Sequence, residues 1–368
     1  MSGQPFGPSR HATRPCCFIL PPDVLARLAE EGSPEQREAA MKSVAASASL
    51  RSRRSLVSQV VQELDTRSRK KLSALAPPPG ERKTVYDVQN GGDEDLPGVK
   101  KRGEGDRPTK DDAVNEAYDN ADMTYDFYKD VLKRNSIDDR GMELISSVHF
   151  GTDFDNAFWN GSQMVYGDCS GEILARGSLT RDIAVVAHEI THGVTQYTAG
   201  LRYSKQSGAL NESFSDVVGS LVKQYAAKEA ADEADWLIGE GVLGTALQGV
   251  ALRSMKAPGT AFNFDNQPAH MDDYMDLPDD NNPRNDNGGV HINSGIPNKA
   301  FYLAAIKLGG HSWEEAGPIW YDALKNLTPN SQFKDAAKAT IASAGALFGK
   351  RKKQERAVRE AWKEVGVL

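Results

Sequence analysis

The segment that most constrains how this chain can fold is residues 181–197, RDIAVVAHEITHGVTQY. Its apolar residues recur every three or four positions, which predicts an amphipathic helix. Such a helix places His188 and His192 one turn apart on the same face. Two imidazoles held in this way can chelate one zinc ion, and the carboxylate of Glu189 can take a proton from water in the same site.

The predicted ends of this helix follow from its flanking residues. Thr180 is expected to cap the start, and Gly200 is expected to mark the stop. Taken alone, the motif leaves an alternative open, in which the helix carries one packed and one exposed histidine without any metal.

A second acidic motif, GALNESFSD at 208–216, follows about 20 residues later and opens another predicted helix. Glu212 and Asp216 are four residues apart and therefore share one side of that helix. Glu212 can complete a His2Glu zinc site whose fourth position stays open to water. Asp216 can accept the free N–H of a ligand histidine and so fix its tautomer. The alternative is a solvated acidic face.

The sequence HEITH followed by GALNESFSD resembles the thermolysin family of zinc metallopeptidases, and the resemblance runs from about Tyr86 to the C-terminus. It implies an α+β fold with a strand-rich N-terminal lobe and an all-helical C-terminal lobe, joined at the central zinc-binding helix. The front of the chain resembles the short prosegment of the protealysin-like subgroup. The expected divisions are a small helical prosegment at 1–75, the N-terminal catalytic lobe at 76–198 and the C-terminal lobe at 199–368.

The resemblance implies a zinc-dependent neutral endopeptidase that is made as a precursor and hydrolyses peptide bonds through water. Zinc is held by His188, His192 and Glu212, and Glu189 is the general base. Further along the chain, four more residues match the family's catalytic positions: Tyr203 and His291 as oxyanion donors, and Asp216 and Asp286 as partners that orient histidines.

The same resemblance assigns residues to substrate binding. Asn156 and Ala157 lie in a predicted edge strand, whose free N–H and C=O groups can accept an extended peptide as a further strand. Arg253 matches the arginine that binds a substrate carbonyl. An apolar pocket for the residue after the scissile bond is expected from four residues: Val185, Ile238, Val242 and Leu252.

Residues 1–72 carry a net charge of +5 and the remainder carries −12, so a basic front can dock on an acidic body. The stretch Phe18–Leu25, FILPPDVL, resembles the Pro-Pro motif of the subgroup's inhibitory prosegment, which occupies the substrate cleft. Cys16 or Cys17 is a candidate to cap the zinc, and the alternative is a thiol packed among apolar groups. Cleavage is expected in the Pro-rich linker at 67–82.

Calcium is less well supported than zinc, because Ala184 and Lys223 stand where the family's double calcium site has acids, although Asp235 and Glu240 remain. The net charge of −7 argues against nucleic acid as a partner. No run reaches the length of a membrane span. We expect a monomer that acts on proteins or peptides and is either cytoplasmic or exported without a cleaved signal peptide.

A rival hypothesis is a zymogen-locked or catalytically inactive zinc protein that acts through its cleft. It requires a missing base or oxyanion donor, yet Glu189, Tyr203 and His291 are all present in the sequence.

Overall fold

A six-stranded mixed sheet organises the N-terminal half of the molecule. The computed structural model describes residues 17–47, 50 and 82–368. The strand order is β1-β5-β6-β4-β2-β3. The strands are β1 Cys17–Phe18, β2 Lys83–Asp87, β3 Val99–Arg102, β4 Leu144–Val148, β5 Ala157–Trp159 and β6 Met164–Tyr166. The strand that the sequence predicts at the edge, β5, therefore has a neighbour on both sides, because β1 of the prosegment pairs with it antiparallel.

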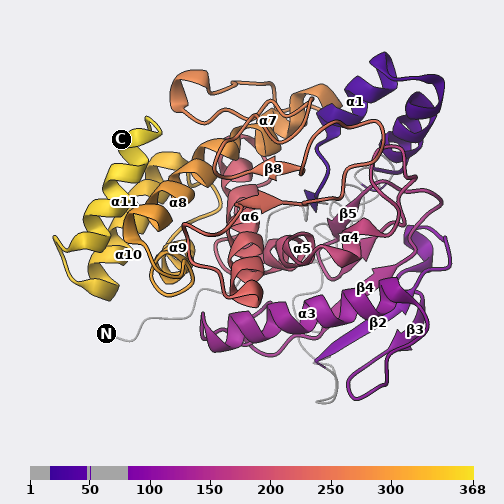
Figure 1. The fold of residues 1–368 in the computed structure, drawn as a ribbon, viewed down its shortest axis with the longest axis horizontal. Coiled ribbons are helices and arrows are strands. Elements are labelled where there is room, and N and C mark those ends of the chain that lie inside the picture. The colour runs from indigo at the N-terminus through magenta and orange to yellow at the C-terminus, as the bar shows by residue number, and fades with distance from the viewer. Residues whose placement is uncertain (1–16, 48–49, 51–81) are drawn as a thin grey trace, which may run out of the picture.

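Helix α3, Asp112–Asp130, packs against this sheet and runs beside β2 and β4 in Figure 1. Most of its alanine and aromatic side chains are buried, among them Ala117, Ala121, Tyr125 and Phe127. Asp111 caps the start by accepting hydrogen bonds from two backbone amides of the first turn. The helix ends at Asp130, with Val131 as its C-cap.

The central helix is α5, Ile183–Gln196, and nearly all its residues are buried. The prediction that Thr180 caps it is wrong: the cap is Asp182, whose Oδ1 accepts from the backbone N–H of Val185 at 3.0 Å. Thr180 belongs to the separate short helix α4, Ser178–Arg181, and its hydroxyl donates to Glu116 of α3. The histidine spacing is unaffected by this change.

Helix α6, Lys205–Ala227, crosses beside α5 and ends where Lys228 adopts a left-handed backbone conformation. The helix that the 208–216 motif predicts is therefore present, and it stops at residue 227. The following segment contains two short paired strands, β7 Leu237–Ile238 and β8 Arg253–Ser254. Between α6 and α7, Asp286–Asn293, the C-terminal lobe is mostly irregular, and this two-residue pairing and two single-turn 3-10 helices are its named elements there.

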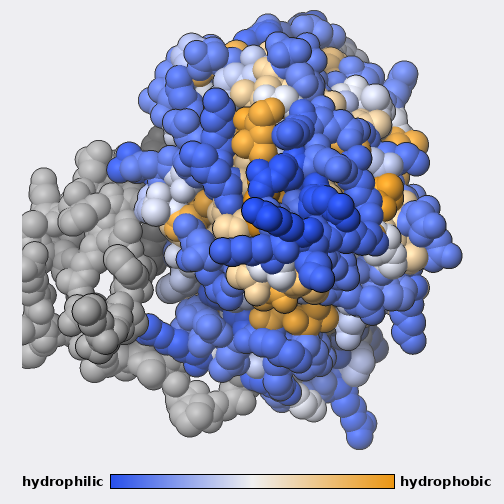
Figure 2. All heavy atoms as spheres, turned by 90° about the vertical axis from the view of Figure 1, so that its left-hand side faces the viewer, coloured by the Kyte–Doolittle hydropathy of each residue, from blue (hydrophilic) through white to orange (hydrophobic). Residues whose placement is uncertain are grey.

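The remainder of the C-terminal lobe is a stack of helices, of which α8 to α11 lie at the left of Figure 1 and α7 nearer its centre. They are α7 Asp286–Asn293, α8 Gly295–Leu308, α9 Ala316–Lys325, α10 Phe333–Phe348 and α11 Lys353–Glu364. Three short 3-10 helices complete the described elements: η1 Asp93–Asp95, η2 Met271–Asp273 and η3 Pro283–Asn285. On the face formed by these C-terminal helices, Figure 2 shows hydrophobic side chains only in small groups separated by hydrophilic ones.

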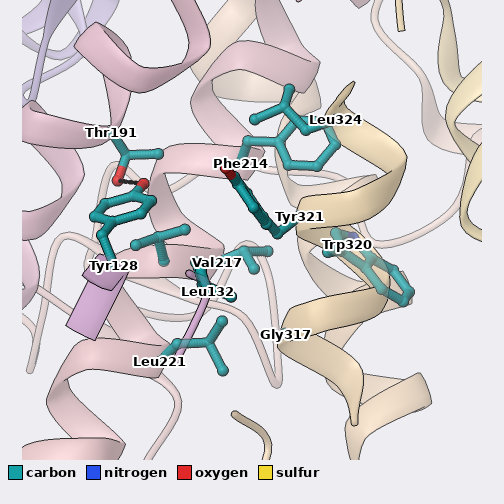
Figure 3. A pocket seen from close by; sticks show the side chains of 11 residues that line it. Tyr128, Leu132, Thr191, Phe214, Val217, Leu221, Gly317, Trp320, Tyr321 and Leu324 are labelled. Carbon is teal, nitrogen blue, oxygen red and sulfur yellow. Dashed lines mark hydrogen bonds between the residues drawn. The ribbon is translucent and has the colours of Figure 1, made fainter. Parts of the chain in front are cut away.

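The face of α5 that lies away from the histidines is fixed by packing. Thr191, in the middle of the HEITH sequence, is buried and its hydroxyl lies 2.8 Å from the hydroxyl of Tyr128 in α3 (Figure 3). A small apolar cavity beside this pair is lined by side chains of α6 and α9, including Val217 and Trp320. This contact ties the central helix to α3, so the position of its histidines depends on both lobes.

The described part of the prosegment folds against the body. Helix α1, Pro22–Glu31, lies against η3 (Figure 1), and a second helix spans 34–47. The second helix begins with the capping box that the sequence predicts: Ser33 Oγ accepts from the N–H of Gln36, and Gln36 Oε1 accepts from the N–H of Ser33. The amphipathic pattern at 56–64 lies outside the described residues.

Candidate active site

Three buried side chains from two helices converge at the centre of the molecule. The Nε2 atoms of His188 and His192 are 2.9 Å apart, and each lies 3.4–3.6 Å from a carboxylate oxygen of Glu212. Within the described residues, these three form the group whose ligand atoms all lie within 4.8 Å of one another. Helix α5 supplies the two histidines and α6 supplies the carboxylate, as the spacing of the two motifs predicts.

The orientation of both histidine rings is fixed by hydrogen bonds at Nδ1, the ring nitrogen that faces away from the other ligands. Nδ1 of His188 donates to Asp216 at 2.8 Å, and Nδ1 of His192 donates to Asn211 at 2.9 Å. With Nδ1 protonated, each Nε2 is left with a free lone pair that points at the other two ligand atoms. Asn211 was missed by the sequence analysis, although it stands directly before Glu212 in the same motif.

The donor set fits a zinc ion in both chemistry and hydrogen bonding. Two imidazoles and one carboxylate are the ligands of many catalytic zinc sites. Oε2 of Glu212 and both carboxylate oxygens of Glu189 are buried without a hydrogen-bond partner. Unpartnered buried polar atoms are rare in native proteins and here indicate the place of an ion and its water. Burial raises the pKa of Glu189 to about 8.

Two further donors border the site. Tyr203 donates its hydroxyl proton to Glu212 and lies 3.2 Å from Nε2 of His291. Nδ1 of His291 donates to Asp286 at 2.6 Å. Burial lowers the pKa of His291, but the carboxylates of Asp286 and Glu212 outweigh burial and raise it to about 10. Both ring nitrogens face acceptor oxygens, Nδ1 that of Asp286 and Nε2 the carbonyl of Phe18, which favours a ring protonated on both.

The backbone before His291 explains the two glycines of its motif. Gly288 and Gly289 both have φ near +80°, a region that favours glycine. A Cβ on Gly288 would lie 2.6 Å from Cγ of Lys205, and one on Gly289 would lie 2.5 Å from Nδ2 of Asn293. This tight turn brings Asp286 and His291 together. The histidine itself sits in helical backbone rather than in an open loop.

The prosegment lies along β5 beside the zinc ligands. The N–H of Ile19 donates to the carbonyl of Ala157 at 3.0 Å, and the N–H of Leu20 donates to Oδ1 of Asn156 at 3.0 Å. Nδ2 of Asn156 returns a longer hydrogen bond of 3.4 Å to the carbonyl of Leu20. The two residues expected to hold a peptide main chain thus hold this chain's own prosegment.

Two side chains bind the carbonyls of the same segment. Nη1 of Arg253 donates to the carbonyl of Ile19 at 2.9 Å, and Nε2 of His291 donates to the carbonyl of Phe18 at 2.7 Å. Arg253 is itself fixed by a forked pair of 2.8 Å hydrogen bonds to Asp216, which also holds His188. One carboxylate therefore connects the metal site to the peptide-binding arginine.

The apolar residues expected to form a pocket are all fully buried and share a hydrophobic cluster with Ile19. Leu252 and Val242 both lie close to Gly239, where an added Cβ would be 2.8 Å from Leu252 and 3.1 Å from Val242. Ile238 pairs with Arg253 across the short β7-β8 sheet. Val185 contributes from the first turn of α5.

Of the two cysteines considered as zinc ligands, Cys17 is buried in β1 and pairs with Trp159. It is not among the three residues whose ligand atoms lie within 4.8 Å of one another, and its role as a cap on the zinc stays a prediction. Cys16 lies outside the described residues.

A buried acid of the prosegment was missed by the sequence analysis. Asp23, in the first turn of α1, is only 2% exposed, and its Oδ2 accepts from Asn266 at 3.3 Å. Its other oxygen has no partner. Burial and the nearby charge of Asp286 raise its pKa to about 7, although Arg27 and His291 oppose the shift.

Comparisons with known proteins agree with this geometry. Residues 59–196 match the catalytic domain of thermolysin metallopeptidases, and residues 199–367 match the alpha-helical domain of the same family. An extracellular metalloprotease of Pectobacterium carotovorum subsp. carotovorum is 45% identical over 363 residues, which cover 96% of this chain and 97% of that protein. Protease PrtS of a Photorhabdus strain is 48% identical over 77% of this chain and 76% of its own length.

Among solved structures, the precursor of protealysin, a metalloproteinase from Serratia proteamaculans, superposes with a TM-score of 0.80 at 44% identity. The match covers 96% of this chain and 100% of that one. The chain therefore belongs to the thermolysin family of metallopeptidases and has the protealysin-like form of its fold. It is a zinc-dependent metalloendopeptidase made as a precursor, and the predicted fold class is confirmed.

Proposed function

We propose that His188, His192 and Glu212 hold one catalytic zinc ion and that Glu189 is the general base of peptide hydrolysis. When bound, zinc polarises the scissile carbonyl and makes water a stronger nucleophile. Glu189 accepts the proton of the attacking water and passes it to the leaving amine. The observation that carries this proposal is the convergence of three buried ligands beside an unpartnered carboxylate.

The hydrogen-bond donors around the site have separate roles in the reaction. His291, and Tyr203 once it is released from Glu212, donate to the oxygen of the scissile carbonyl as negative charge develops there. Asp286 keeps His291 protonated and oriented, and Asp216 does the same for the tautomer of His188. The hydrogen bond from His291 to a peptide carbonyl supports this assignment.

The Glu189→Gln variant tests the assignment of the base. Glutamine keeps the size of the side chain but cannot accept a proton, so kcat should fall by about 100-fold or more while zinc content stays at one ion per chain. Peptide cleavage and metal analysis on the same sample measure both. Unreduced turnover with Gln at this position would remove Glu189 from the mechanism.

Substrate preference should follow the apolar pocket. Val185, Ile238, Val242 and Leu252 belong to the same buried hydrophobic core as Ile19, so apolar residues directly after the scissile bond should be favoured. Asn156, Ala157 and Arg253 should hold the substrate main chain. Cleavage of a peptide library followed by sequencing of the new N-termini tests this preference. Charged residues at that position would contradict it.

We infer that the prosegment, residues 1–75, blocks the N-terminal lobe at 76–198 and the C-terminal lobe at 199–368 until it is removed. Its occupation of β5, Arg253 and His291 supports this arrangement. Cutting in the linker at 67–82 would release it. An intact chain that is fully active on peptides would contradict inhibition by the prosegment.

The rival proposal, an inactive zinc protein that acts through its cleft, has little support from the site. The base, the ligands and both oxyanion donors lie together, and family relatives are named as proteases. A chelator-sensitive cleavage of casein by the matured chain separates the two proposals.

Calcium is not needed at the family's double site in this chain. The ammonium group of Lys223 lies 2.5 Å from Asp235 and 3.0 Å from Glu240, the two acids that remain there. A bound cation at the same place would meet this positive charge. Zinc is therefore the only metal that we propose.

The mature enzyme is proposed to act as a monomer, since the face in Figure 2 carries only scattered hydrophobic groups. In the described residues, no helix has the length and apolar character of a membrane span. The Pectobacterium relative is named an extracellular metalloprotease, which supports the proposal that this enzyme acts outside the cell. Light scattering during size-exclusion chromatography and fractionation of cultures test these two statements.

A further inference from the structure

The prosegment lies across the site as a substrate would, with one peptide bond at the catalytic groups. We propose that the Phe18–Ile19 bond is itself hydrolysed by the enzyme, within the same molecule, as a cut separate from the one that removes the prosegment. This inference rests on the proposed function, because it uses the same base and the same oxyanion donors.

The register of the segment defines which bond is presented. His291 donates to the carbonyl of Phe18, so this carbonyl occupies the position assigned to the reacting one. The next carbonyl, of Ile19, is bound by Arg253, and the Ile19 amide, which would be the leaving nitrogen, donates to Ala157. Both sides of one bond are thus fixed by groups with assigned roles in substrate binding.

Side chains on either side of this bond agree with that register. Ile19 is fully buried in the cluster that contains Val185 and Leu252, so an apolar residue follows the bond as the proposed preference requires. Phe18 points to the opposite face of the strand, where its ring packs 5.3 Å from the ring of Phe158. Alternation of the two side chains is that of an extended peptide added to a sheet edge.

The reaction is an ordinary hydrolysis and needs only water. Water adds its oxygen to the carbonyl carbon of Phe18, and Glu189 takes one of its protons. The carbon–nitrogen bond to Ile19 then breaks, and the proton moves from Glu189 to that nitrogen. The products are a carboxylate on Phe18 and a free amine on Ile19.

The two products are held unequally. On the described side before the bond, Cys17 and Phe18 pair with two residues of β5. On the side after the bond, Ile19 and Leu20 lead into α1, which packs on the body and whose Glu30 accepts from Arg284. Residues 1–18 should therefore leave first, while the new N-terminus at Ile19 stays in the pocket and continues to block it until the linker is cut.

The test follows the full-length chain by intact mass and N-terminal sequencing. The protein is purified with a chelator present, and zinc is then added. We expect a peptide that ends at Phe18 and a chain that begins at Ile19, with a rate that does not change on dilution. Release of a prosegment that still contains an intact Phe18–Ile19 bond would overturn the proposal. A rate proportional to protein concentration would overturn cutting within one molecule.

Substitutions at Ile19 provide matched variants, because this residue is absent from the mature enzyme. Ile19→Val keeps an apolar branched side chain and should be cut at a similar rate. Ile19→Asp places a charge in the apolar pocket, so the cut should slow by on the order of a hundredfold. Equal cutting of both variants would contradict the assigned register.

A reporter peptide separates this inference from the proposed function. If the matured enzyme cleaves the reporter but no preparation yields the Ile19 terminus, the inference fails and the protease assignment stands. If the zinc-loaded chain cuts neither the reporter nor itself, both fail together. The Glu189→Gln chain should keep its full mass in either case.

Discussion

The buried acid of the prosegment makes its docking depend on pH, and the size of the effect follows from the structure. Asp23 has a pKa of about 7 in the docked state, against the ordinary value of 3.8. Each pKa unit corresponds to about 1.4 kcal/mol, so ionised Asp23 weakens docking by up to about 4 kcal/mol. Because the docked pKa is raised, docking is strongest below pH 4 and weakens as pH rises through 7. Between pH 5 and pH 8 the calculated loss is about 2–3 kcal/mol.

The groups that face Asp23 are Asp286, which raises its pKa further, and Arg27, His291 and Asn266, which lower it. The informative change is Asp23→Asn. An amide cannot ionise and can still accept from Asn266, so the variant should keep its docking energy nearly constant from pH 5 to pH 8. Above pH 7 its prosegment should dock more tightly than that of the parent chain.

Hydrogen exchange at the Ile19 and Leu20 amides measures this opening, because both amides donate hydrogen bonds across the contact. A Glu189→Gln background prevents self-cleavage, and opening energies are corrected for the intrinsic pH dependence of exchange. Glu30→Gln serves as the matched control, since Glu30 is an exposed prosegment acid whose pKa its contact with Arg284 lowers, so its loss should leave the slope of docking energy between pH 5 and pH 8 unchanged. A parent chain whose opening energy is flat between pH 5 and pH 8 would refute the argument, as would an Asn variant with an unchanged slope.

Three further predictions concern the enzyme body. Tyr128→Phe removes the hydrogen bond to Thr191 without changing the packing, so urea unfolding should show a loss of about 1 kcal/mol; a loss near zero would mean that this bond adds nothing. Arg253→Lys keeps the positive charge but loses the forked contact with Asp216. The free energy of unfolding should therefore fall by roughly 2–4 kcal/mol, and KM for a peptide substrate should rise. An unchanged KM would exclude the role of Arg253 in carbonyl binding. Added calcium should leave the melting temperature of the parent unchanged, whereas Lys223→Ala should melt lower because two carboxylates lose their cation; a parent that calcium stabilises would contradict this.

The three zinc ligands were predictable because their positions follow from short spacings along the sequence. His188 and His192 are one turn apart on any regular helix, and Glu212 opens the next helix along the chain. The ends of α5 were less predictable. Thr180 and Asp182 are both good capping residues, and the choice between them was decided by Glu116 in α3, which binds the Thr180 hydroxyl.

What the sequence pattern could not supply is the fit between distant segments. The Pro-Pro motif pointed to the cleft, but the pairing of Cys17 with Trp159 is set by contacts 142 residues apart. Strands β7 and β8 have two residues each, which is too short for an alternating pattern. The environment of Asp23 likewise comes from Asn266 and Asp286, far along the chain.

The pairing of β1 with β5 also has a consequence for how the protein is made. Synthesis begins at the N-terminus, so the strand that covers β5 exists before β5 itself leaves the ribosome. An unpaired sheet edge can pair with strands of other chains. Here β1 is available to pair with β5 as soon as β5 has been synthesised. Because the prosegment is removed only after folding, that edge stays covered until the rest of the sheet is complete.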